Sequence, residues 1–569
     1  MLKRIRLSVL FIVFSLPLFA QISVDPQNEF YSDVGSWYLK GYIVSIPQIK
    51  PYPASVIKQI LEDVAERGEV SDVQKARSYI ERYFNKNHVG ISGQVDVKLK
   101  NVEQGGTGIA DGYKVGALGY GRLFAAGDNV FSDFISLGYD AGFIAANNNY
   151  AQNEILPVFE TDANRNFIKN YSIAAGNADF LFDINASASI GNEKIYGSFG
   201  FNKLGYTLYP DDDIILNPSS YQILNGSFHY NGEIFKYSQI FALPAARSYA
   251  NKNDYGALKF MSFHAFETRL FSQKLNLSFY ESVVWGKYFS PAYLIPAPWF
   301  IIANVAGFNE NVISGVSLEW KMLPCIALTA SAAFDDLKPK QFMKLKMNDA
   351  AVRTAFKTGF VYSPYNSSVS LISLDYTLVT PYTYTSYNRF DDSYNFMDYT
   401  NFGMGIGTKL PPNSDRVSFN MRFKPFNRMK VSVETTFARH ANPYEDLSDE
   451  EVLKIKDELH KVSTGGNIMS DSRGTDTALD FTGFLKQDHI MYITQAAFGI
   501  SYEFVKHGAH SVELSGRYTI EYIKKDGVME DMYHNISDSA SVANARNAWV
   551  NNLHDSYNHY FNCGIKIMF

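Results

Sequence analysis

A tyrosine-rich stretch in the second half of the chain, residues 382–416, carries the side chains best suited to bind a ligand. It reads YTYTSYNRFDDSYNFMDYTNFGMGIGTKLPPNSDR and interleaves aromatic rings with carboxylates, amides and arginines. A sugar ring has an apolar C–H face and a rim of hydroxyl groups, so aromatic platforms beside hydrogen-bonding groups fit it. The candidate sugar-binding residues here are Tyr384, Tyr387, Arg389, Asp391, Asp392, Asn401, Asp415 and Arg416. The alternative is that these side chains only pack and solvate an exposed loop.

Three other stretches have a loop-like composition. Residues 287–311 place Trp299, a further sugar-binding candidate, beside Phe300, three prolines and several asparagines, and residues 147–177 mix Asn, Tyr and acidic side chains. Either stretch can fold inward to constrict a lumen or serve as a binding surface. In residues 441–490, Ser448 and Glu451 have the spacing of a capping box, which predicts a helical lid.

The sequence contains no clear catalytic site. Asp335 and Asp336 could pair for glycan hydrolysis or bind a divalent cation, but neighbouring side chains on a strand point to opposite faces. The chain has no HExxH, CxxC or GxSxG sequence, and GMGIGTK lacks the spacing of a phosphate-binding loop. A hydrolase assembled from His, Ser and Asp on separate strands is the remaining enzymatic alternative. We therefore expect no enzyme, and no catalytic, cofactor-binding or metal-binding residues.

Both ends of the chain indicate export and membrane insertion. Residues 1–20, MLKRIRLSVLFIVFSLPLFA, have a basic start, a short apolar core and a small final residue, as a secretory signal peptide does. The last ten residues, YFNCGIKIMF, alternate apolar and polar side chains up to Phe569, which predicts a strand with one apolar face. This ending is similar to the terminal signal of bacterial outer-membrane proteins, which implies the barrel-assembly machinery as a partner through Phe569.

The composition excludes a helical membrane protein but allows a membrane barrel. Only 46% of the residues are hydrophobic, the mean hydropathy is −0.16, and no segment after residue 20 is a continuous apolar run of spanning length. In a barrel, lipid-facing and lumen-facing residues alternate, and an aromatic content of 15% suits its interfacial girdles. Residues 1–20 hold three of the 52 basic side chains and none of the 58 acidic ones, so without them the net charge falls from −6 to −9. This charge disfavours a nucleic-acid partner.

From residue 89 to the end, the sequence alternates with a period of two. Eighteen such segments, the first at 89–100 and the last at 556–569, give the even strand number of a single-chain outer-membrane barrel. Every second gap between them is short and, with one exception near 246–253, the others are long, as periplasmic turns and outer loops are. Residues 401–410 also alternate, and we assign them to an outer loop because another strand would break the even number. Cys325 and Cys563 lie in apolar strand patterns, which favours inert positions over a disulfide.

Residues 30–86 follow the period of a helix instead. Ile57, Ile60, Leu61 and Val64 are spaced as one face of a helix that ends at Gly68, and the stretches on either side have similar patterns. Three short amphipathic helices are too few for a large core, so we expect a small bundle that docks on another part of the fold. The predicted organisation is a signal peptide at 1–20, a helical bundle at 30–86, and an all-β transmembrane antiparallel barrel of about 18 strands at 89–569.

Several segments resemble the Wzi-type capsule assembly proteins. They are WYLKGYIVSIPQIKPYPASVIKQIL at 37–61, SPAYLIPAPWF followed by NENVISGVSLEW and by FDDL up to Leu337, and YTNFGMGIGTKLPPNSDRVSFNMRF at 399–423. The resemblance is spread over most of the chain. Its most specific part is a Gly-rich stretch, a Pro-Pro and an Asp-Arg pair that follow a tyrosine-rich loop.

This resemblance implies a fold and a role. The implied fold is an eighteen-stranded barrel in the bacterial outer membrane, with the helical bundle on the periplasmic side and the outer loops at the cell surface. The implied role is capsule or surface-polysaccharide assembly and attachment by a glycan-binding protein that is not an enzyme and needs no cofactor. Outer-membrane lipid and surface polysaccharide are the implied partners. The resemblance does not assign individual polysaccharide-contacting residues.

A channel for solutes is the alternative function. Eighteen strands enclose enough room for a pore, and charged side chains on the strands could line it with water. The candidate lining residues are Lys98, Asp140, Lys259, Glu319, Lys357, Arg422 and Glu434. Long aromatic loops weigh against an open pore.

Overall fold

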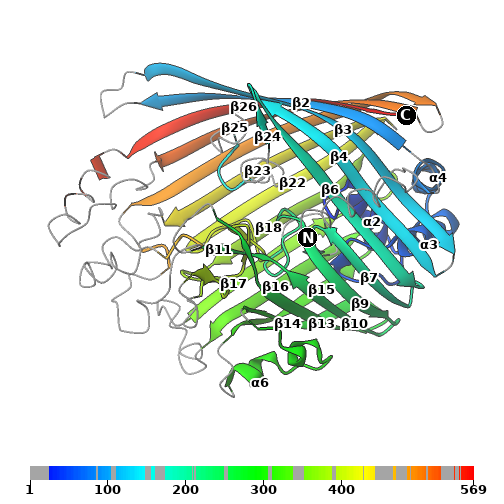
Figure 1. Ribbon diagram of the computed structural model, residues 1–569. Coiled ribbons are helices and arrows are strands. Elements are labelled where there is room, and N and C mark those ends of the chain that lie inside the picture. Colours follow the sequence, from blue (N-terminus) through cyan, green and yellow to red (C-terminus); the bar gives the residue numbers. More distant parts are fainter. Residues whose placement is uncertain are drawn as a thin grey trace, which may run out of the picture.

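The computed structural model of the chain is a closed barrel of eighteen antiparallel strands (Figure 1). The structure describes residues 23, 25–84, 88–103, 110–132, 134–147, 156–160, 173–207, 209, 213–248, 254–286, 288–305, 310–337, 352–386, 393–426, 428–441, 465–468, 484–486, 489–507, 510–526, 544, 547, 550–551 and 553–569. The predicted signal peptide at 1–20 and the helical lid predicted around Ser448 lie outside these residues. The predicted fold class is confirmed.

The barrel strands match the eighteen alternating segments of the sequence. They are β2 (His88–Glu103), β3 (Ala110–Ser132), β4 (Ile135–Asn147), β6 (Ala178–Gly191), β7 (Ile195–Asn202), β9 (Ile223–Asn231), β10 (Phe235–Leu243), β13 (Phe260–Leu270), β14 (Leu275–Trp285), β15 (Asn311–Leu323), β16 (Ile326–Leu337), β17 (Val352–Tyr362), β18 (Val369–Val379), β22 (Ser414–Phe426), β23 (Met429–Ala441), β24 (Ile490–His507), β25 (His510–Asp526) and β26 (His554–Met568). A short strand, β5 (Ile173–Ala175), pairs only with the start of β6.

The barrel closes between its first and last strands. β26 pairs with β2 along most of its length, from Met568 opposite Gly90 to Ser556 opposite Val102. The backbone N–H of Phe569 donates to the carbonyl oxygen of Val89, with 2.9 Å between the two atoms. The alternating C-terminal sequence therefore forms the strand that leaves the sheet without an open edge.

The outer wall is apolar because every second residue of a strand points away from the lumen. On β2 the outward side chains of Ile91 and Val95 are about half exposed, whereas the inward Asp96 is buried. On β26 the outward Phe561 and Ile565 are exposed in the same way. A closed barrel with an apolar outer band is the architecture of bacterial outer-membrane proteins. The protein is accordingly placed in the outer membrane, with its long connections at the cell surface.

Short and long connections lie at opposite ends of the barrel (Figure 1). Hairpin turns such as 232–234 and 324–325 join strands at one end, and the long connections join them at the other. Residues 401–410 belong to a long connection, where β20 (Thr400–Asn401) and β21 (Met404–Gly405) pair only with each other. Their assignment to a loop is confirmed.

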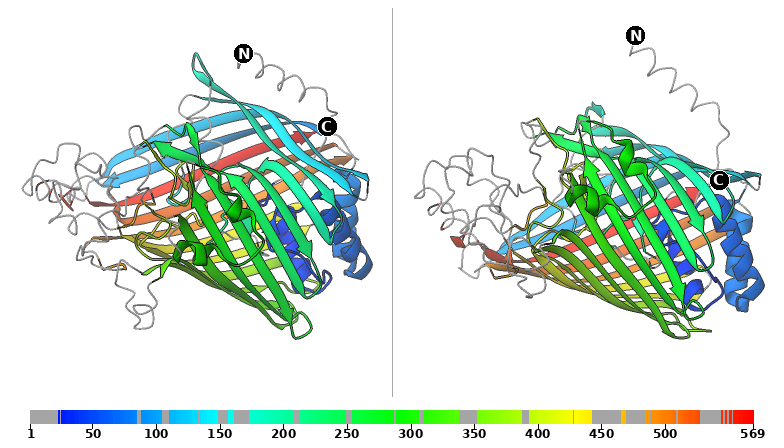
Figure 2. Two further views of the ribbon diagram at one scale, coloured as in Figure 1. Left: turned by 60° about the horizontal axis from the view of Figure 1, so that its bottom comes forward. Right: turned by 90° about the horizontal axis from the view of Figure 1, so that it is seen from below.

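Three helices occupy the short-turn end. α3 (Ala54–Arg67) buries Ile57, Ile60 and Val64 as its spacing predicts, ends before Gly68 and packs against α4 (Val70–Tyr83). α2 (Glu29–Leu39) differs because its residues from Phe30 onward are buried on all sides. Figures 1 and 2 show α2 within the end of the barrel and α3 and α4 outside it. Within the described residues, no helix is long and apolar enough to cross a membrane.

We use the name plug for residues 29–53, which comprise α2 and the chain up to the start of α3. The phenolic O–H of Tyr38 donates to Glu319 on the inner side of β15, with 3.3 Å between the oxygens. The Arg269 guanidinium, on the inner side of β13, donates to the carbonyl oxygens of Val44 and Ile46 at 2.9 and 2.8 Å. The plug also supplies a short strand, β1 (Ile49–Lys50), that pairs with β8 (Gly205–Tyr206) inside the barrel.

The described residues of two long connections, 203–222 and 380–413, fold into the lumen, and we call them the inserted loops. Ile214 and Leu216 from the first and Tyr399 and Leu410 from the second pack against inward side chains of the wall. These wall residues include Ile240, Met261, Phe263, Tyr280 and Ile313. One side of the lumen is therefore a packed apolar core, whereas the wall of an open pore faces water.

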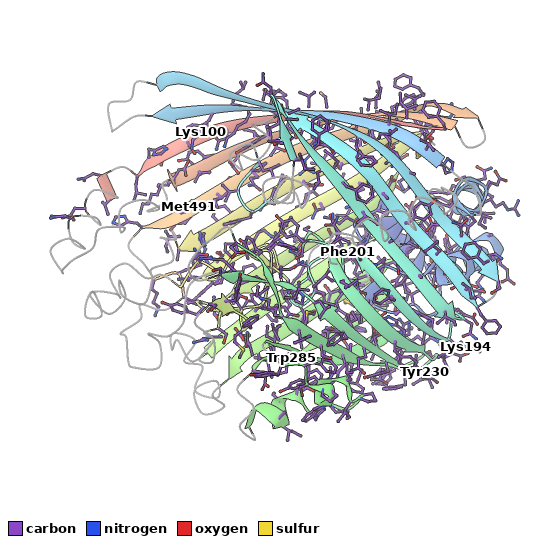
Figure 3. The ribbon with its side chains drawn as sticks, in the orientation of Figure 1. Lys100, Lys194, Phe201, Tyr230, Trp285 and Met491 are labelled. Atoms are coloured by element: carbon purple, nitrogen blue, oxygen red, sulfur yellow. The ribbon has the colours of Figure 1, made fainter. Side chains whose placement is uncertain are left out.

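Another long connection does not fold inward. The described residues 288–305, which we call the outer flap, contain a 3₁₀ turn η3 (Pro291–Leu294) and a short helix α6 (Phe300–Val305). They pack against Phe241, Phe260 and Trp285, which point away from the lumen. Both views of Figure 2 show α6 over the outer face of the strands, and Figure 3 shows Trp285 at the same edge of the wall. The flap therefore does not constrict the lumen.

Candidate functional site

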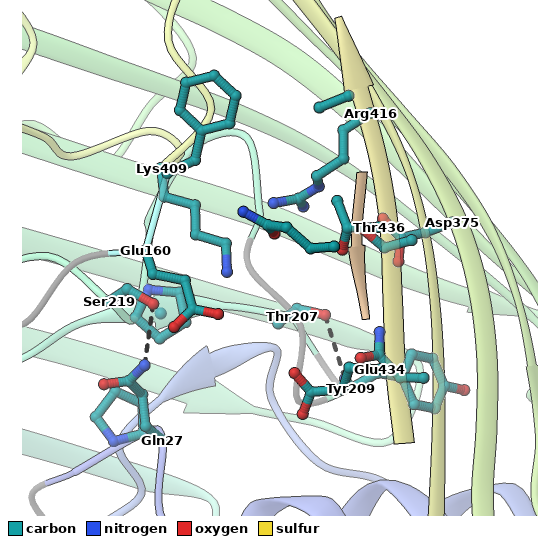
Figure 4. A pocket seen from close by; sticks show the side chains of 18 of the residues that line it. Gln27, Glu160, Thr207, Tyr209, Ser219, Asp375, Lys409, Arg416, Glu434 and Thr436 are labelled. Atoms are coloured by element: carbon teal, nitrogen blue, oxygen red, sulfur yellow. Dashed lines mark hydrogen bonds between the residues drawn. The ribbon is translucent and has the colours of Figure 1, made fainter. Parts of the chain in front are cut away.

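A polar cavity remains inside the barrel between the plug, the inserted loops and the wall formed by β18 and β22–β24. Its volume is about 230 Å³, and we call it the chamber. The wall contributes Asp375, Arg416, Ser418, Asn420, Arg422, Glu434, Thr436, Ala438, Ile493 and Gln495, and the inner segments contribute Gln27, Lys50, Thr207, Tyr209, Ser219, Lys409 and residues 158–160. Figure 4 shows side chains from these two sides pointing toward one another.

The wall side of the chamber follows from strand geometry. Arg416, Ser418, Asn420 and Arg422 are successive inward residues of β22, at every second position. β23 runs antiparallel beside β22 and aligns Glu434 with Asn420, so acceptors and donors lie side by side across the strands. The period of two thus turns a linear run of polar residues into one polar surface.

A piece of the connection between β4 and β6 completes the chamber. The backbone N–H of Val158 donates to Glu521 at 2.8 Å, and the Gln495 side-chain amide donates to the Val158 carbonyl at 2.9 Å. The Arg517 guanidinium binds Glu160 at 3.1 Å and Glu434 at 2.8 Å. Residues 156–160 are therefore held inside the barrel, which is the inward folding that the composition of 147–177 allowed.

A smaller cavity of about 60 Å³ adjoins the chamber through Thr207, Tyr209 and Asp375, which line both. Tyr209 donates its phenolic O–H to the Glu319 carboxylate at 2.8 Å. Burial and this carboxylate raise the pKa of Tyr209 well above its ordinary value, so the phenol stays protonated and remains a donor. Its aromatic ring supplies a flat surface beside the charged groups of the chamber.

The chamber mixes both signs of charge with neutral hydrogen-bonding groups. Lys50, Lys409, Arg416 and Arg422 bring positive charge, and Glu160, Asp375 and Glu434 bring negative charge. Hydroxyls and amides of Thr207, Ser219, Ser418, Asn420, Thr436 and Gln495 add donors and acceptors. Among the described residues, no cluster of three or more His, Cys, Asp or Glu could hold a metal ion.

The sequence-predicted sugar-binding candidates that the structure describes do not gather at one place. Arg416 lines the chamber. Tyr384 is fully buried, where its backbone N–H donates to Asp335 at 2.6 Å and its ring stacks on Tyr399. Asn401 is also buried, and its side chain accepts from the backbone N–H of Ala245 at 2.9 Å. These contacts of Tyr384 and Asn401 hold the second inserted loop in place.

Two further described candidates, Asp415 and Trp299, do not line the chamber. Asp415 points to the outer side of β22, where it binds the Arg439 guanidinium at 2.9 Å and the Tyr376 hydroxyl at 3.1 Å. Trp299 belongs to the outer flap and stacks on Tyr293 at 5.7 Å between ring centroids. Tyr387, Arg389, Asp391 and Asp392 lie outside the described residues. Sugar binding by all nine candidates stays a prediction.

Most residues predicted to line a lumen do face it, although the inserted segments occupy the space. Glu319, Lys357, Arg422 and Glu434 line the two cavities, and Asp140 pairs with Arg122 at 2.6 Å on the inner wall. Lys259 lies between strands instead and is buried in an ion pair with Asp398. Sequence reasoning missed Tyr209, Lys409 and Glu160, because nothing in their local pattern shows that their loops fold inward. The alternation of side chains along the strands identified Asp140, Glu319, Lys357, Arg422 and Glu434 as inward residues.

Comparison with known proteins supports the architecture. Wzi of Escherichia coli, a carbohydrate-binding β-barrel involved in group 1 capsule assembly, has a similar structure with a TM-score of 0.50. The likeness covers 96% of this chain and 99% of Wzi at 12% sequence identity. OccK8 of Pseudomonas aeruginosa is less similar, with a TM-score of 0.39 at 7% identity over 86% of this chain and 100% of OccK8.

Sequence comparison gives no further assignment. No protein family model matches the chain, and no curated protein matches it. The structural likeness to Wzi at 12% identity concerns the fold. The resemblance noted in the sequence is therefore confirmed at that level: this chain shares the overall fold of the Wzi outer-membrane barrel.

Proposed function

We propose that the protein binds glycan at the cell surface and serves in the assembly or attachment of capsule or another surface polysaccharide. The observation that carries the proposal is the chamber, a polar cavity inside a barrel in which one side of the lumen is filled by apolar side chains. Its residues offer what a sugar needs, namely paired donors and acceptors for hydroxyl groups and the Tyr209 ring for a C–H face. The shared fold with Wzi, a carbohydrate-binding protein, is consistent with this role.

The charge of the chamber favours a glycan with acidic sugars. Arg416 and Arg422 lie on the same face of β22, and Lys409 approaches from the opposite side. A guanidinium binds a carboxylate with two parallel hydrogen bonds, which gives both affinity and orientation. Arg517 binds Glu160 and Glu434. Together with Arg517, the cationic lining residues Lys50, Lys409, Arg416 and Arg422 outnumber the carboxylates Glu160, Asp375 and Glu434 by five to three, so positive charge remains.

A solute channel is the competing function. The plug and the apolar core around Tyr280 and Tyr399 fill one side of the lumen. A wide porin requires a continuous water-filled passage, which such packing opposes. The geometry of the chamber gives the enzymatic alternative no specific support.

Two measurements on the purified protein in detergent and in planar bilayers separate these functions. We expect retention of acidic surface polysaccharide on immobilised protein and little steady current across the bilayer. A large steady current without glycan retention would overturn the proposal in favour of transport. Retention of neutral and acidic glycans alike would keep the binding role but contradict the role of charge.

The remaining partners belong to the same proposal. The helices α3 and α4 lie at the short-turn end, which is the periplasmic end in outer-membrane barrels. We infer that the predicted bundle at 30–86 lies on the periplasmic side, with α3 and α4 outside the barrel and α2 within its end, and that the barrel-assembly machinery recognises the terminal strand with Phe569. Outer-membrane lipid surrounds the apolar wall.

A further inference from the structure

The outer wall of β10, β13 and β14 contains polar residues where lipid-facing residues are expected. Because side chains alternate between the two faces of a strand, Gln239, Ser262, His264 and Glu281 point away from the lumen. The apolar Phe266 and Phe279 point to the same outer face. Glu281 lies two residues along β14 from Phe279, which pairs with the outward Val316 of β15. Since Val316 is half exposed on the apolar wall, these polar groups stand at the depth of the membrane. Charged and polar groups are costly on a lipid-facing wall.

The outer flap covers these groups and binds them. His264 Nε2 lies within hydrogen-bond distance of Glu281 Oε2, at 2.9 Å, and both side chains are buried. Glu281 also accepts from the backbone N–H groups of Phe300 and Ile301, at 3.3 and 3.1 Å. The Phe300 ring stacks on the imidazole of His264 at 4.2 Å between centroids.

A second contact fixes the other half of the flap. The hydroxyl of Ser262 donates to the carbonyl oxygen of Tyr293 at 2.6 Å, and the Gln239 amide donates to the same oxygen at 3.4 Å. The Tyr293 ring lies 4.7 Å from the ring of Trp285. The inner side of the flap is therefore matched to the polar groups of the wall at two points.

The outer side of the flap is apolar. Tyr288, Phe289, Leu294, Ile295, Ile301 and Ile302 are all between 41% and 75% exposed. The sequence from Tyr288 to Asn309 contains no Asp, Glu, Lys or Arg. A loop in water does not concentrate this much exposed apolar surface without a partner.

An apolar groove lies next to the flap on the same outer wall. Its volume is about 600 Å³, and its lining includes Phe235, Phe266, Leu277, Phe279, Val316, Leu318, Ala330, Ala332 and Phe356. Phe266 connects the two features, because its ring lies 5.2 Å from that of His264 beneath the flap. The exposed surface of the flap is thus continuous with the lipid-facing surface of the barrel.

We propose that the outer flap is embedded in the hydrocarbon layer of the outer leaflet and that its partner is the acyl chains of membrane lipid. The flap covers the polar patch around His264 and Glu281 and presents an apolar surface to the lipid instead. Its amphipathic character is reversed relative to a water-exposed loop, since the polar contacts face the protein and the apolar side chains face outward. The alternative partner for this surface is a second copy of this chain.

Site-directed spin labelling of the full chain in lipid bilayers tests the proposal. A nitroxide is attached at Ile302→Cys in a background with Cys325→Ala and Cys563→Ala, because both native cysteines are free. Its collision rates are measured with oxygen, which concentrates among acyl chains, and with a water-soluble nickel chelate. Val316→Cys supplies the reference for lipid, and Val70→Cys, 76% exposed on α4, supplies the reference for water.

We expect the label at Ile302 to have an oxygen-to-nickel ratio as high as that at Val316. A ratio equal to that at Val70 would overturn the proposal. Loss of access to both reagents, with spin–spin broadening between labels, would show a second copy on the flap and would also overturn it. Ile295→Cys repeats the measurement at the other end of the flap, and circular dichroism of each variant verifies that the barrel has folded.

Discussion

Tyr209 of the first inserted loop donates its phenolic O–H to Glu319 on the barrel wall, with 2.8 Å between the two oxygens. The same carboxylate accepts from Tyr38 of the plug at 3.3 Å. A single wall residue, Glu319, therefore holds both the loop that follows β7 and the helix α2 by hydrogen bonds. Glu319 thus connects two inner segments that lie about 170 residues apart in the sequence, Tyr38 and Tyr209, through one carboxylate.

Tyr209→Phe is expected to lower the free energy of unfolding by about 2 kcal/mol, because a buried carboxylate loses one of its donors. Thermal unfolding of the protein in detergent, followed by circular dichroism, measures the change. Tyr230→Phe is the matched control, since Tyr230 points outward on β9 and is 40% exposed. Equal unfolding temperatures for the two variants would contradict the supporting role of the Tyr209 hydroxyl.

Acid is expected to loosen the plug. Burial alone raises the pKa values of Glu29 and Asp33, but Lys424 and Lys75 beside both, with Lys430 beside Glu29, outweigh it and hold these pKa values below their ordinary range. Carboxylates with lowered folded-state pKa values stabilise the docked plug above the unfolded pKa of about 4. This stabilisation is lost as the pH falls through the folded-state values.

Conductance across planar bilayers at decreasing pH tests this expectation. The current is expected to be low and constant from neutral pH to about pH 5 and to rise below about pH 4. Asp33→Asn, which removes a buried charge bound by Lys424 and Lys75, is expected to destabilise docking by about 3 kcal/mol and to raise the current already at neutral pH. A current that stays low in acid and in this variant would show that other contacts alone hold the plug.

Arg416→Ala is expected to weaken binding of an acidic surface glycan at least about tenfold, the effect of losing one charge-assisted hydrogen bond. Arg439→Ala is the control, because Arg439 is an arginine on the neighbouring strand that binds Asp415 on the outer side of the wall. Titration calorimetry with purified polysaccharide measures both. Similar losses for the two variants, or none for Arg416→Ala, would place the glycan outside the chamber.

Glu281→Leu is expected to release the outer flap, since the N–H groups of Phe300 and Ile301 and the His264 ring lose their common partner. The expected cost is about 3 kcal/mol of unfolding free energy, with faster motion of a spin label at Ile302. Glu66→Leu, at an exposed position of α3, is the control. An unchanged label spectrum in Glu281→Leu would show that apolar packing alone holds the flap.

Gly315→Ala is expected to destabilise the barrel by about 1–3 kcal/mol through overpacking. A Cβ atom at Gly315 would lie 2.2 Å from the Ala332 carbonyl oxygen and 2.5 Å from the Tyr280 ring, which fills the apolar part of the lumen. Gly119→Ala on β3 is the matched control, because its nearest neighbour would be 3.9 Å away. Denaturant unfolding in detergent compares the two, and equal midpoints would mean that the Tyr280 side of the core can move aside.

The sequence by itself determined the wall of this protein. Each strand between His88 and Met568 faces lipid on one side and the lumen on the other, so its side chains alternate with a period of two. This local pattern predicted the number of strands, the closure of the barrel and the inward direction of Arg422 and Glu434. The same rule separates the neighbours Asp415 and Arg416 onto opposite faces. The helical period likewise predicted the buried face of α3.

Only the tertiary structure decided what fills and covers the wall. The Tyr384 hydroxyl donates to the carbonyl oxygen of Ile214, and the Asn401 side chain accepts from the backbone N–H of Ala245. Both contacts join segments that are more than 150 residues apart in the sequence. Glu160 points inward because it binds Arg517, which is far away in the sequence. Trp299 lies on the outer face because it stacks on Tyr293, which is bound to the strands beneath it. Connections carry no period, and their direction is set by long-range packing and hydrogen bonds that no local pattern contains.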